Sequence, residues 1–413
     1  MANGKYDFNW SELFKWALLL LIVSIAAGTF SAIFLSSLNW VTNYRESHQW
    51  LIYLLPVAGL AIGLLYDHRG KSVVRGNNLV FDIIHNPKDT IPFIMLPFVL
   101  AGTLITHLCG GSAGREGTAL QMAASAADQL HRPFKLNPEE RRILLITGLS
   151  AGFASVFGTP LAGAIFGIEV LMMRKFPLKA ILPAFIGAFL GAYVTELSGV
   201  GHTHYYIAEV PSLSLMRMGF GILAGILFGL AAVLFVKSTH YISQFSKVIK
   251  YPPLRPVLGG VLIVAAFLIL HSSKYLGLGV PEIVKSFEEP SLPQDFLLKI
   301  LLTAITLGFG FKGGEVTPLF YIGATLGSAL SLFLPMPVGL LAGMGFVAVF
   351  SASAKTPIAC CLMAIELFGI SCGIYAAIAC IVAYMVSGRQ GIYNFPENKT
   401  PRHFLFGSFA LFS

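Results

Sequence analysis

The chain has 413 residues, of which 55% are hydrophobic and only 12% are charged, and its formal net charge is +8. A mean hydropathy of +0.75 excludes a water-soluble globular protein and predicts an all-α polytopic membrane protein. Basic residues are spread over most loops, which indicates attraction to the surface of a lipid bilayer and gives no case for nucleic-acid binding.

Apolar runs of roughly the length that crosses a bilayer occur along the whole chain. Several are too short or too long for one simple span, and many are interrupted by Gly or Pro. Broken and re-entrant helices that meet inside the membrane give this pattern, and transporters bind their substrates at such breaks. The runs cover residues 16–38, 51–66, 91–108, 146–172, 181–197, 218–236, 257–270, 296–309, 318–350 and 358–386.

The first polar segments flank these runs. Residues 1–15 include Trp10, Phe14 and Lys15, which suit an interfacial helix, and no cleavable signal peptide is evident. Further on, a Gly-Asn-Asn turn at residues 76–78 leads into an apolar stretch and predicts a loop that enters a helix. Asn77 then either caps that helix or offers its amide group to a ligand.

The central motif is Gly-Gly-Ser-Ala-Gly-Arg-Glu-Gly-Thr at residues 110–118. It predicts a helix that starts at Thr118 and points its free N–H groups back at the glycine loop, which is the geometry of an anion site. Glu116 would then occupy the place of the anion, where a carboxylate competes with the anion and takes up protons. A Gly-rich turn by itself more often only packs helices, so other evidence has to decide.

Residues 128–142 form a polar loop, in which Asn137-Pro138-Glu139-Glu140 predicts a helix start. Residues 148–172 form a long small-residue segment suited to tight helix packing, and residues 198–212 form a polar linker.

The second half of the chain repeats marks of the first. They recur at separations of 201, 199 and 197 residues, in the pairs Gly76 and Gly277, Glu116 and Glu315, and Thr159 and Thr356. This order predicts two inverted-topology repeats, residues 1–212 and residues 213–413 with a short C-terminal tail, and sites where the repeats meet.

Four acidic residues lie inside the apolar segments, where a carboxylate is costly and marks an ion or proton path: Glu116, Glu169, Glu315 and Glu366. Glu169 and Glu366 occupy matching places in the repeats, which favours a structural role. Glu116 and Glu315 lie in glycine loops, which favours function. The five cysteines lack metal-site spacing, and we expect no metal, no cofactor and no disulfide.

The Gly114-Arg115-Glu116-Gly117 motif, the Gly313-Gly314 loop and the two-repeat plan resemble the CLC family of chloride channels and anion/proton antiporters, over residues 15–395. The resemblance implies a homodimer with a separate anion pathway in each subunit, lined by the N-termini of broken helices. It also implies a multi-pass protein of a bacterial inner (plasma) membrane.

The resemblance also implies roles for single residues. Glu116 matches the gating and proton-transferring glutamate. Asn77 matches the serine that coordinates the central anion, the Tyr393 hydroxyl faces the same anion, and Val316 offers a backbone amide. Gly117 and Thr118 belong to the same predicted anion site.

Differences from the chloride-transporting members indicate which branch of the family the sequence resembles. Thr118 replaces a proline, Asn77 replaces the serine, and Val170 stands where proton-coupled members have an internal glutamate. Glu315 and Thr317 replace apolar residues. This combination is similar to the fluoride-exporting branch, which implies that Glu116 itself returns the proton and that Glu315 and Thr317 lie near the inner path.

The chemistry of fluoride agrees with these residues. Fluoride is small and a strong hydrogen-bond acceptor, so its site needs donors, and the Asn77 amide and the Thr317 and Tyr393 hydroxyls are donors. The sequence therefore predicts a fluoride/proton antiporter that exports fluoride, and hence fluoride resistance. The alternative is a chloride channel or chloride/proton exchanger of the same family. An enzyme is not expected, because no Ser-His or His-Glu constellation lies in the apolar segments.

Overall fold

The computed structural model describes residues 10–171 and 178–393, and within these ranges all regular secondary structure is helical. The first half contains α1 (Trp10–Ser47), α2 (Leu55–His68), α3 (Asn77–His85), α4 (Met95–Leu108), α5 (Glu116–Asp128), α6 (Pro138–Phe157), α7 (Pro160–Glu169) and α8 (Ile181–Leu197). The second half contains α9 (Leu215–Ser246), α10 (Leu254–Leu270), α11 (Val280–Lys285), α12 (Asp295–Gly308), α13 (Val316–Leu330), α14 (Val338–Ala354), α15 (Pro357–Phe368) and α16 (Gly373–Val386). Short 3₁₀ helices cover Gln49–Leu54, Lys71–Val73, Leu178–Ala180 and Ile370–Cys372.

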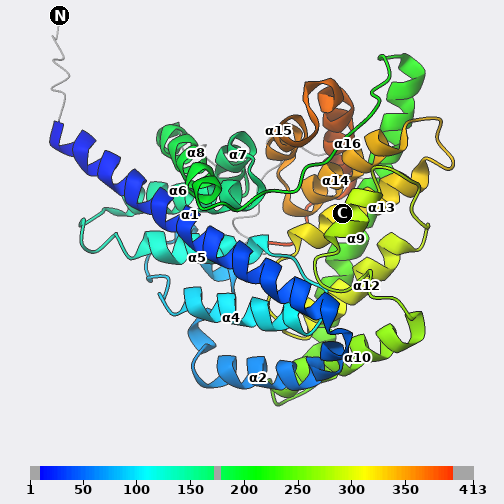
Figure 1. Cartoon of the computed structure of the whole chain (residues 1–413). Helices are drawn as coiled ribbons and strands as arrows, with labels where there is room; N and C mark the ends of the chain where they lie inside the picture. The colour runs from blue at the N-terminus through cyan, green and yellow to red at the C-terminus, as the bar shows by residue number, and fades with distance from the viewer. Residues whose placement is uncertain (1–9, 172–177, 394–413) are drawn as a thin grey trace, which may run out of the picture.

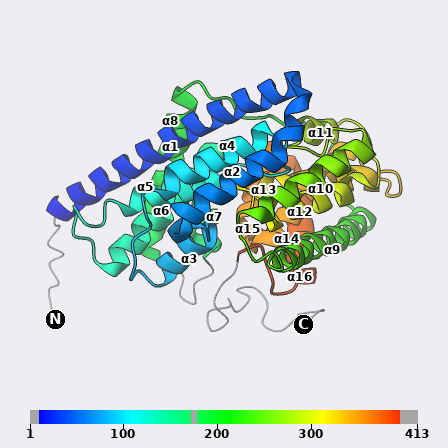
Figure 2. The same ribbon diagram turned by 90° about the horizontal axis from the view of Figure 1, so that it is seen from below.

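The two halves follow the same order of elements. A long helix opens each half, α1 with 38 residues and α9 with 32, and α4 and α12 have 14 residues each. These two shorter helices begin 200 residues apart, at positions 95 and 295. In Figure 1 the helices of the first half lie on the left and those of the second half on the right. Figure 2 shows α1 and α9 on opposite sides of the molecule.

Small residues allow the helices to approach closely. On α1, Ser24, Ala27, Gly28 and Ser31 are buried at helical spacing, and a Cβ added to Gly28 would lie only 2.6 Å from the carbonyl oxygen of Gly191 on α8. Such small-residue faces are how helices pack in membranes, where contact between backbones replaces the hydrophobic effect.

The small-residue segment that starts at residue 148 is divided between two helices, as expected for apolar runs that are interrupted by Gly and Pro. Helix α6 ends at Gly158, whose φ of +68° lies in the left-handed region, and α7 starts at Pro160. The second repeat breaks in the same way, at Lys355 with a φ of +62° and at Pro357. A left-handed residue followed by a proline at the first helical position ends one helix and starts the next.

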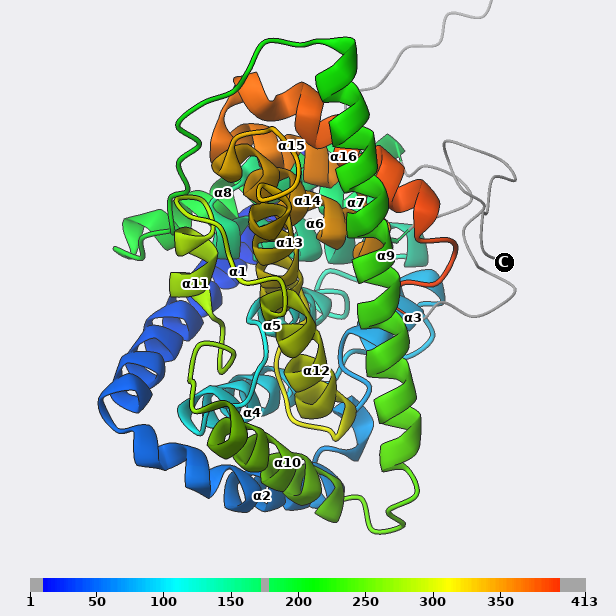
Figure 3. The same ribbon diagram turned by 90° about the vertical axis from the view of Figure 1, so that its right-hand side faces the viewer.

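The centre of the molecule consists of helices that are buried on every side. Nearly all residues of α5, α13 and α14 are buried, which is typical of helices enclosed by other helices. Figure 3 shows α5 and α13 in the middle, between α1 and α9. The glycine loops that precede α5 and α13 therefore lie inside the protein.

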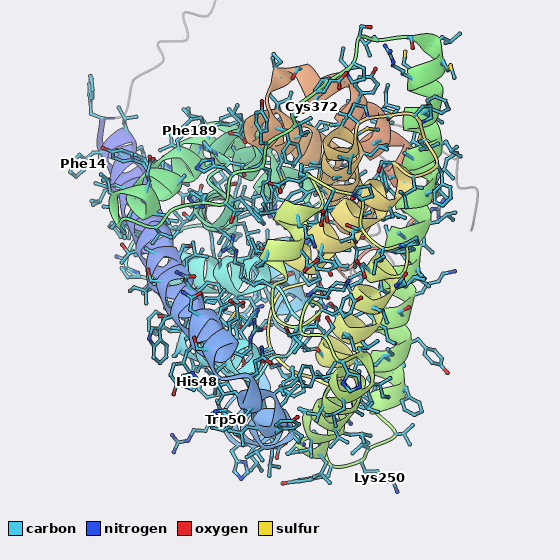
Figure 4. The ribbon with its side chains drawn as sticks, turned by 45° about the vertical axis from the view of Figure 1, so that its right-hand side comes forward. Phe14, His48, Trp50, Phe189, Lys250 and Cys372 are labelled. Carbon is cyan, nitrogen blue, oxygen red and sulfur yellow. The ribbon has the colours of Figure 1, made fainter. Side chains whose placement is uncertain are left out.

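In the part of the chain that the structure describes, four helical segments are long and apolar enough to cross a membrane: Trp10–Ser47, Gln49–His68, Leu178–Leu197 and Leu215–Ser246. Large apolar side chains on their outer faces are exposed, including Phe14, Trp50 and Phe189 (Figure 4). Residues 10–15 are the first turns of α1 and form no separate interfacial helix, which corrects that part of the prediction, and residues 1–9 lie outside the described ranges. The C-terminal tail after Tyr393 also lies outside them.

Candidate functional site

The two glycine loops meet at the centre and pair with each other. The Gly114 amide donates to the Gly314 carbonyl at 2.6 Å, and the Gly314 amide donates to the Gly114 carbonyl at 2.7 Å. This reciprocal antiparallel pair joins the residues just before α5 to those just before α13. It brings the N-termini of two helices from different repeats to one point.

Glu116 is the first residue of α5 and is 1% exposed. Its carboxylate accepts a hydrogen bond from the Thr317 amide at 3.0 Å, another from the Thr317 hydroxyl, and a third from the Arg115 amide at 3.1 Å. The Arg115 Nε lies 3.7 Å from the same carboxylate. An acid therefore occupies the N-terminus of α13, which is a place that favours anions.

This geometry corrects two details of the prediction. Helix α5 begins at Glu116, two residues before the predicted start at Thr118, and the carboxylate binds the helix of the other repeat. The glycine pairing also matches the repeats at a separation of 200 residues. Glu315 therefore corresponds to Arg115, and Glu116 corresponds to Val316. The two acids of these loops are not equivalent.

The backbone amides of the α5 start gather beside Gly314. A Cβ added to Gly314 would lie 2.8 Å from the Gly117 nitrogen, 3.0 Å from the Glu116 nitrogen and 3.2 Å from the Arg115 nitrogen. Only glycine leaves this space open. The amides converge as they do in an anion-binding nest, and they face the residue that precedes α13 by two positions.

The two threonines of the predicted site have different surroundings. The Thr317 hydroxyl contacts Glu116, whereas the Thr118 hydroxyl lies 2.7 Å from the hydroxyl of Thr103 on α4. Val316 is buried at the first position of α13, and the amide that donates to Glu116 belongs to the next residue. The structure therefore brings the Thr317 hydroxyl to the Glu116 carboxylate and turns the Thr118 hydroxyl towards α4.

Asn77 is the first residue of α3, and Gly76 is the N-cap, with a φ of +54° and no side-chain capping hydrogen bond. The interpretation of Asn77 as a helix cap is therefore wrong. A Cβ on Gly117 would lie 2.9 Å from the Asn77 Nδ2, so the amide group reaches the start of α5. Gln121, which sequence reasoning missed, lies beside Gly76, where a Cβ would be 3.2 Å from its Nε2. A polar residue one turn after Glu116 in an apolar stretch was the available signal.

Tyr393 is buried, and its ring packs edge-on against Phe81 of α3 with a centroid distance of 4.7 Å. Its segment is tied to α14 by a 2.9 Å hydrogen bond from the Ile392 amide to the Ser353 carbonyl. The tyrosine lies within electrostatic range of Glu315 and Glu116. Among the described residues, the side-chain carboxylate of Glu315 has no hydrogen-bond or ion-pair partner.

Polar side chains that the prediction did not include hold the Glu116 loop in place. The Ser112 amide donates to the Thr306 hydroxyl at 3.1 Å, and the Ser112 hydroxyl lies 3.0 Å from that of Thr303, both on α12. From α4, the His107 ring lies 3.1 Å from the Ala113 carbonyl. Helices of both repeats therefore hold this loop through hydrogen bonds. The polar side chains that make these bonds could have been found in the sequence as polar residues inside apolar runs.

Glu169 and Glu366 cap each other's helices. The Glu169 carboxylate accepts from the Ile358 and Ala359 amides at the start of α15, at 3.0 and 2.8 Å. The Glu366 carboxylate accepts from the Leu161 and Ala162 amides at the start of α7, both at 2.8 Å. These contacts give both acids a structural task at a distance from the glycine loops.

Two cavities lie near the Glu116 loop, and Arg115 lines both of them. The larger one, here called the basin, has a volume of about 830 Å³ and is lined by residues that include Arg45, Arg115, Thr203, Lys274 and Glu282. The second, here called the small cavity, has a volume of about 20 Å³. Its lining includes Glu116, Thr317, Arg115, His202, Thr203 and Tyr205. This volume is about that of one water molecule or another particle of similar size. In the described ranges, no group of three or more His, Cys, Asp or Glu is arranged to hold a metal.

The family model described as voltage gated chloride channel matches residues 58–388. A protein of Pseudomonas syringae pv. tomato, named chloride/fluoride channel protein, is 52% identical over 92% of this chain and 86% of its own length. The crystal structure of a CLC-type fluoride/proton antiporter superposes with a TM-score of 0.90 at 34% identity, over 94% of this chain and 98% of that chain. A slow cyanobacterial Cl⁻/H⁺ antiporter superposes with a TM-score of 0.78 at 20% identity, over 90% and 94% of the two chains, which shows a shared fold.

Proposed function

Since this chain belongs to the voltage-gated chloride channel (CLC) family of membrane transporters, we propose that it is a fluoride/proton antiporter that exports fluoride. The observation that carries the proposal is the placement of the Glu116 carboxylate on the amide and hydroxyl of Thr317. An acid that sits in an anion's place can leave when it is protonated, and the vacated donors can then take up an anion. One residue thereby couples the two fluxes.

The donors around Glu116 suit a small, strongly accepting anion. The Thr317 hydroxyl, the Asn77 amide beside Gly117 and the amides facing Gly314 are all compact hydrogen-bond donors. Fluoride also bonds strongly to a protonated carboxylic acid. We therefore assign anion binding to Asn77, Gly117, Val316, Thr317 and Tyr393, with Thr118 supporting the start of α5 through Thr103.

The proton returns through Glu116 itself in this proposal. Val170 is fully buried at the position where proton-coupled chloride members carry a second glutamate, so that position offers no titratable group. Glu315 adjoins Thr317 and lies within electrostatic range of Tyr393, which supports a place on the inner path. The basin then faces the outside of the cell, and the protein resides in a bacterial inner membrane.

The chain acts as a transporter without enzymatic chemistry and assembles as a homodimer in this proposal. Exposed apolar side chains on α7, α8, α15 and α16 offer a packing face, for example Leu161, Phe189, Ile358 and Ile374. Cross-linking in detergent at low protein concentration should give a dimer and nothing larger. A clean monomer that still transports would remove assembly from the mechanism.

Efflux from proteoliposomes tests the function. Fluoride and chloride efflux are measured side by side, with and without an imposed proton gradient. We expect fluoride to leave faster than chloride and to be driven by the gradient. If chloride moves as fast or faster, the chloride channel or chloride/proton exchanger is the correct function.

A further inference from the structure

The small cavity contains a second titratable residue that the proposed transport cycle does not yet use. His202, in the loop between α8 and α9, lines this cavity together with Glu116 and Arg115. Its Nδ1 lies 3.2 Å from the carbonyl oxygen of Val156, so the Nδ1–H is the donor there. Its Nε2 is buried and has no hydrogen-bond partner among the described residues.

This tautomer leaves a lone pair on Nε2. A buried lone pair without a partner is unfavourable, because the nitrogen has lost its hydrogen bonds to water. The ring is held by packing over Gly158, where a Cβ would lie 2.6 Å from the ring. Arg115 Nε, on the same cavity, also has no hydrogen-bond partner in the described ranges, although it lies 3.7 Å from Glu116. Two unsatisfied polar atoms and the gate therefore share one space of about 20 Å³.

Residues of the same loop line both the small cavity and the basin. Gly201 and Thr203, the neighbours of His202, line the basin, and Thr203 and Arg115 line both spaces. His202 thus lies on the small cavity, next in the chain to Thr203, which lines both the basin and the small cavity. A group at this place can exchange protons between the basin and Glu116.

We propose that His202 is a proton relay between the basin and Glu116. The neutral ring accepts a proton at Nε2 from water that enters from the basin past Thr203 and Arg115, the residues that line both cavities, and becomes an imidazolium, while Nδ1–H stays on the Val156 carbonyl. The imidazolium then donates the Nε2 proton, through one water in the small cavity, to the Glu116 carboxylate and returns to the neutral ring. This inference rests on the proposed proton coupling and names the residue that supplies its proton.

The charges around His202 suit a relay. Burial lowers the pKa of His202 from its ordinary value, and the neighbouring Arg115 and His204 act in the same direction, while Glu196 on α8 opposes them. The ring is therefore neutral at neutral pH, ready to accept a proton. The negative charge of Glu116 across the cavity then favours transfer to the gate.

Proton flux in proteoliposomes tests the relay, with wild type, His202→Gln and His204→Gln compared. Gln keeps an amide for hydrogen bonding but does not titrate, and His204 is an exposed histidine of the same loop. With the basin side at about pH 7, we expect His202→Gln to slow anion-driven proton flux by on the order of 10²-fold, with recovery on added imidazole and on acidification. His204→Gln should stay close to wild type, because His204 is the smallest of the influences on His202. Wild-type rates in His202→Gln, or a loss equal at every pH that imidazole does not restore, would overturn the relay.

Two further measurements distinguish a failure of the His202 relay from a failure of the proposed fluoride/proton function. If wild type couples protons to chloride and not to fluoride, the fluoride assignment fails and the same variants are compared with chloride. If no proton-coupled flux occurs, NMR titration of the histidine side chains still tests whether His202 and Glu116 interact. We expect the His202 midpoint to fall in Glu116→Gln, because the carboxylate that stabilises the imidazolium is gone, with His204 unchanged. An unmoved His202 midpoint contradicts the proposal.

Discussion

The glycine loops before α5 and α13 pair with each other, yet they carry their charges differently. At the residue before the helix the first loop has Arg115 and the second has Glu315, and at the first helical position the first has Glu116 and the second has Val316. Of these two acids, Glu116 reaches across to the donors of the other repeat, and Glu315 makes no such contact among the described residues. A shared backbone geometry can therefore place an acid in one repeat and present the donors that bind it in the other.

The largest difference between the loops should appear when each acid is neutralised. Glu116→Gln removes the carboxylate that binds the α13 start, so fluoride flux driven by a proton gradient should fall by about 10²-fold or more. Glu315→Gln should slow transport and keep coupling, because that carboxylate has no partner at the gate. Fluoride-electrode and pH recordings on the same liposomes measure both. Coupling at the wild-type level in Glu116→Gln would show that Glu116 is not the gate.

Thr317 and Thr118, which follow the two glycine loops, sharpen the comparison. Thr317→Val deletes a hydroxyl that donates to the Glu116 carboxylate, and such bonds are worth about 1.5–3 kcal/mol. The gate should leave its place more readily, and we expect fluoride flux to change by roughly tenfold or more. Thr118→Val removes only the contact with Thr103, so its effect should be lower thermal stability with flux close to wild type. Equal effects on flux would contradict the different assignment of the two residues.

Substitution of Asn77 tests whether the hydrogen-bond donors near Gly117 set the selectivity between fluoride and chloride. Replacing it by Ser shortens the donor, and loss of one hydrogen bond to a desolvated fluoride should cost about 1–2 kcal/mol, or roughly tenfold in the fluoride-over-chloride ratio. Efflux of both anions from liposomes gives that ratio. Because the Asn77 side chain does not cap α3, an unchanged ratio would move selectivity to Thr317 or Tyr393.

The smallest expected effect on transport belongs to Glu169 and Glu366, the acids that cap each other's helices. Glu169→Gln and Glu366→Gln each weaken a helix cap, which is worth about 1 kcal/mol. Both variants should melt at a lower temperature, by a similar amount, and keep proton coupling. Loss of coupling in either one would give these acids a transport role that their capping contacts do not explain.

Much of the protein follows from local sequence patterns. Apolar runs interrupted by Gly and Pro predicted broken helices, and the breaks lie at Gly158 and Lys355, each followed by a proline at the first helical position. The Asn-Pro-Glu-Glu helix start at residues 137–140 is confirmed as a capping box. These features depend on dihedral preferences and hydrogen bonds within a few residues, which a sequence displays directly.

The tertiary structure alone decided how the halves meet. Glu116 and Thr317 are 201 residues apart, and no local pattern states that the acid of one repeat binds the helix start of the other. The sequence spacing of 199 residues paired Glu116 with Glu315, whereas the reciprocal bonds of Gly114 and Gly314 match the repeats at 200. A shift of one residue changes which side chain faces the gate, and long-range packing and backbone pairing set that register. The sequence thus identified the family, the broken helices and an acid inside a glycine loop, whereas long-range packing determined which groups that acid contacts.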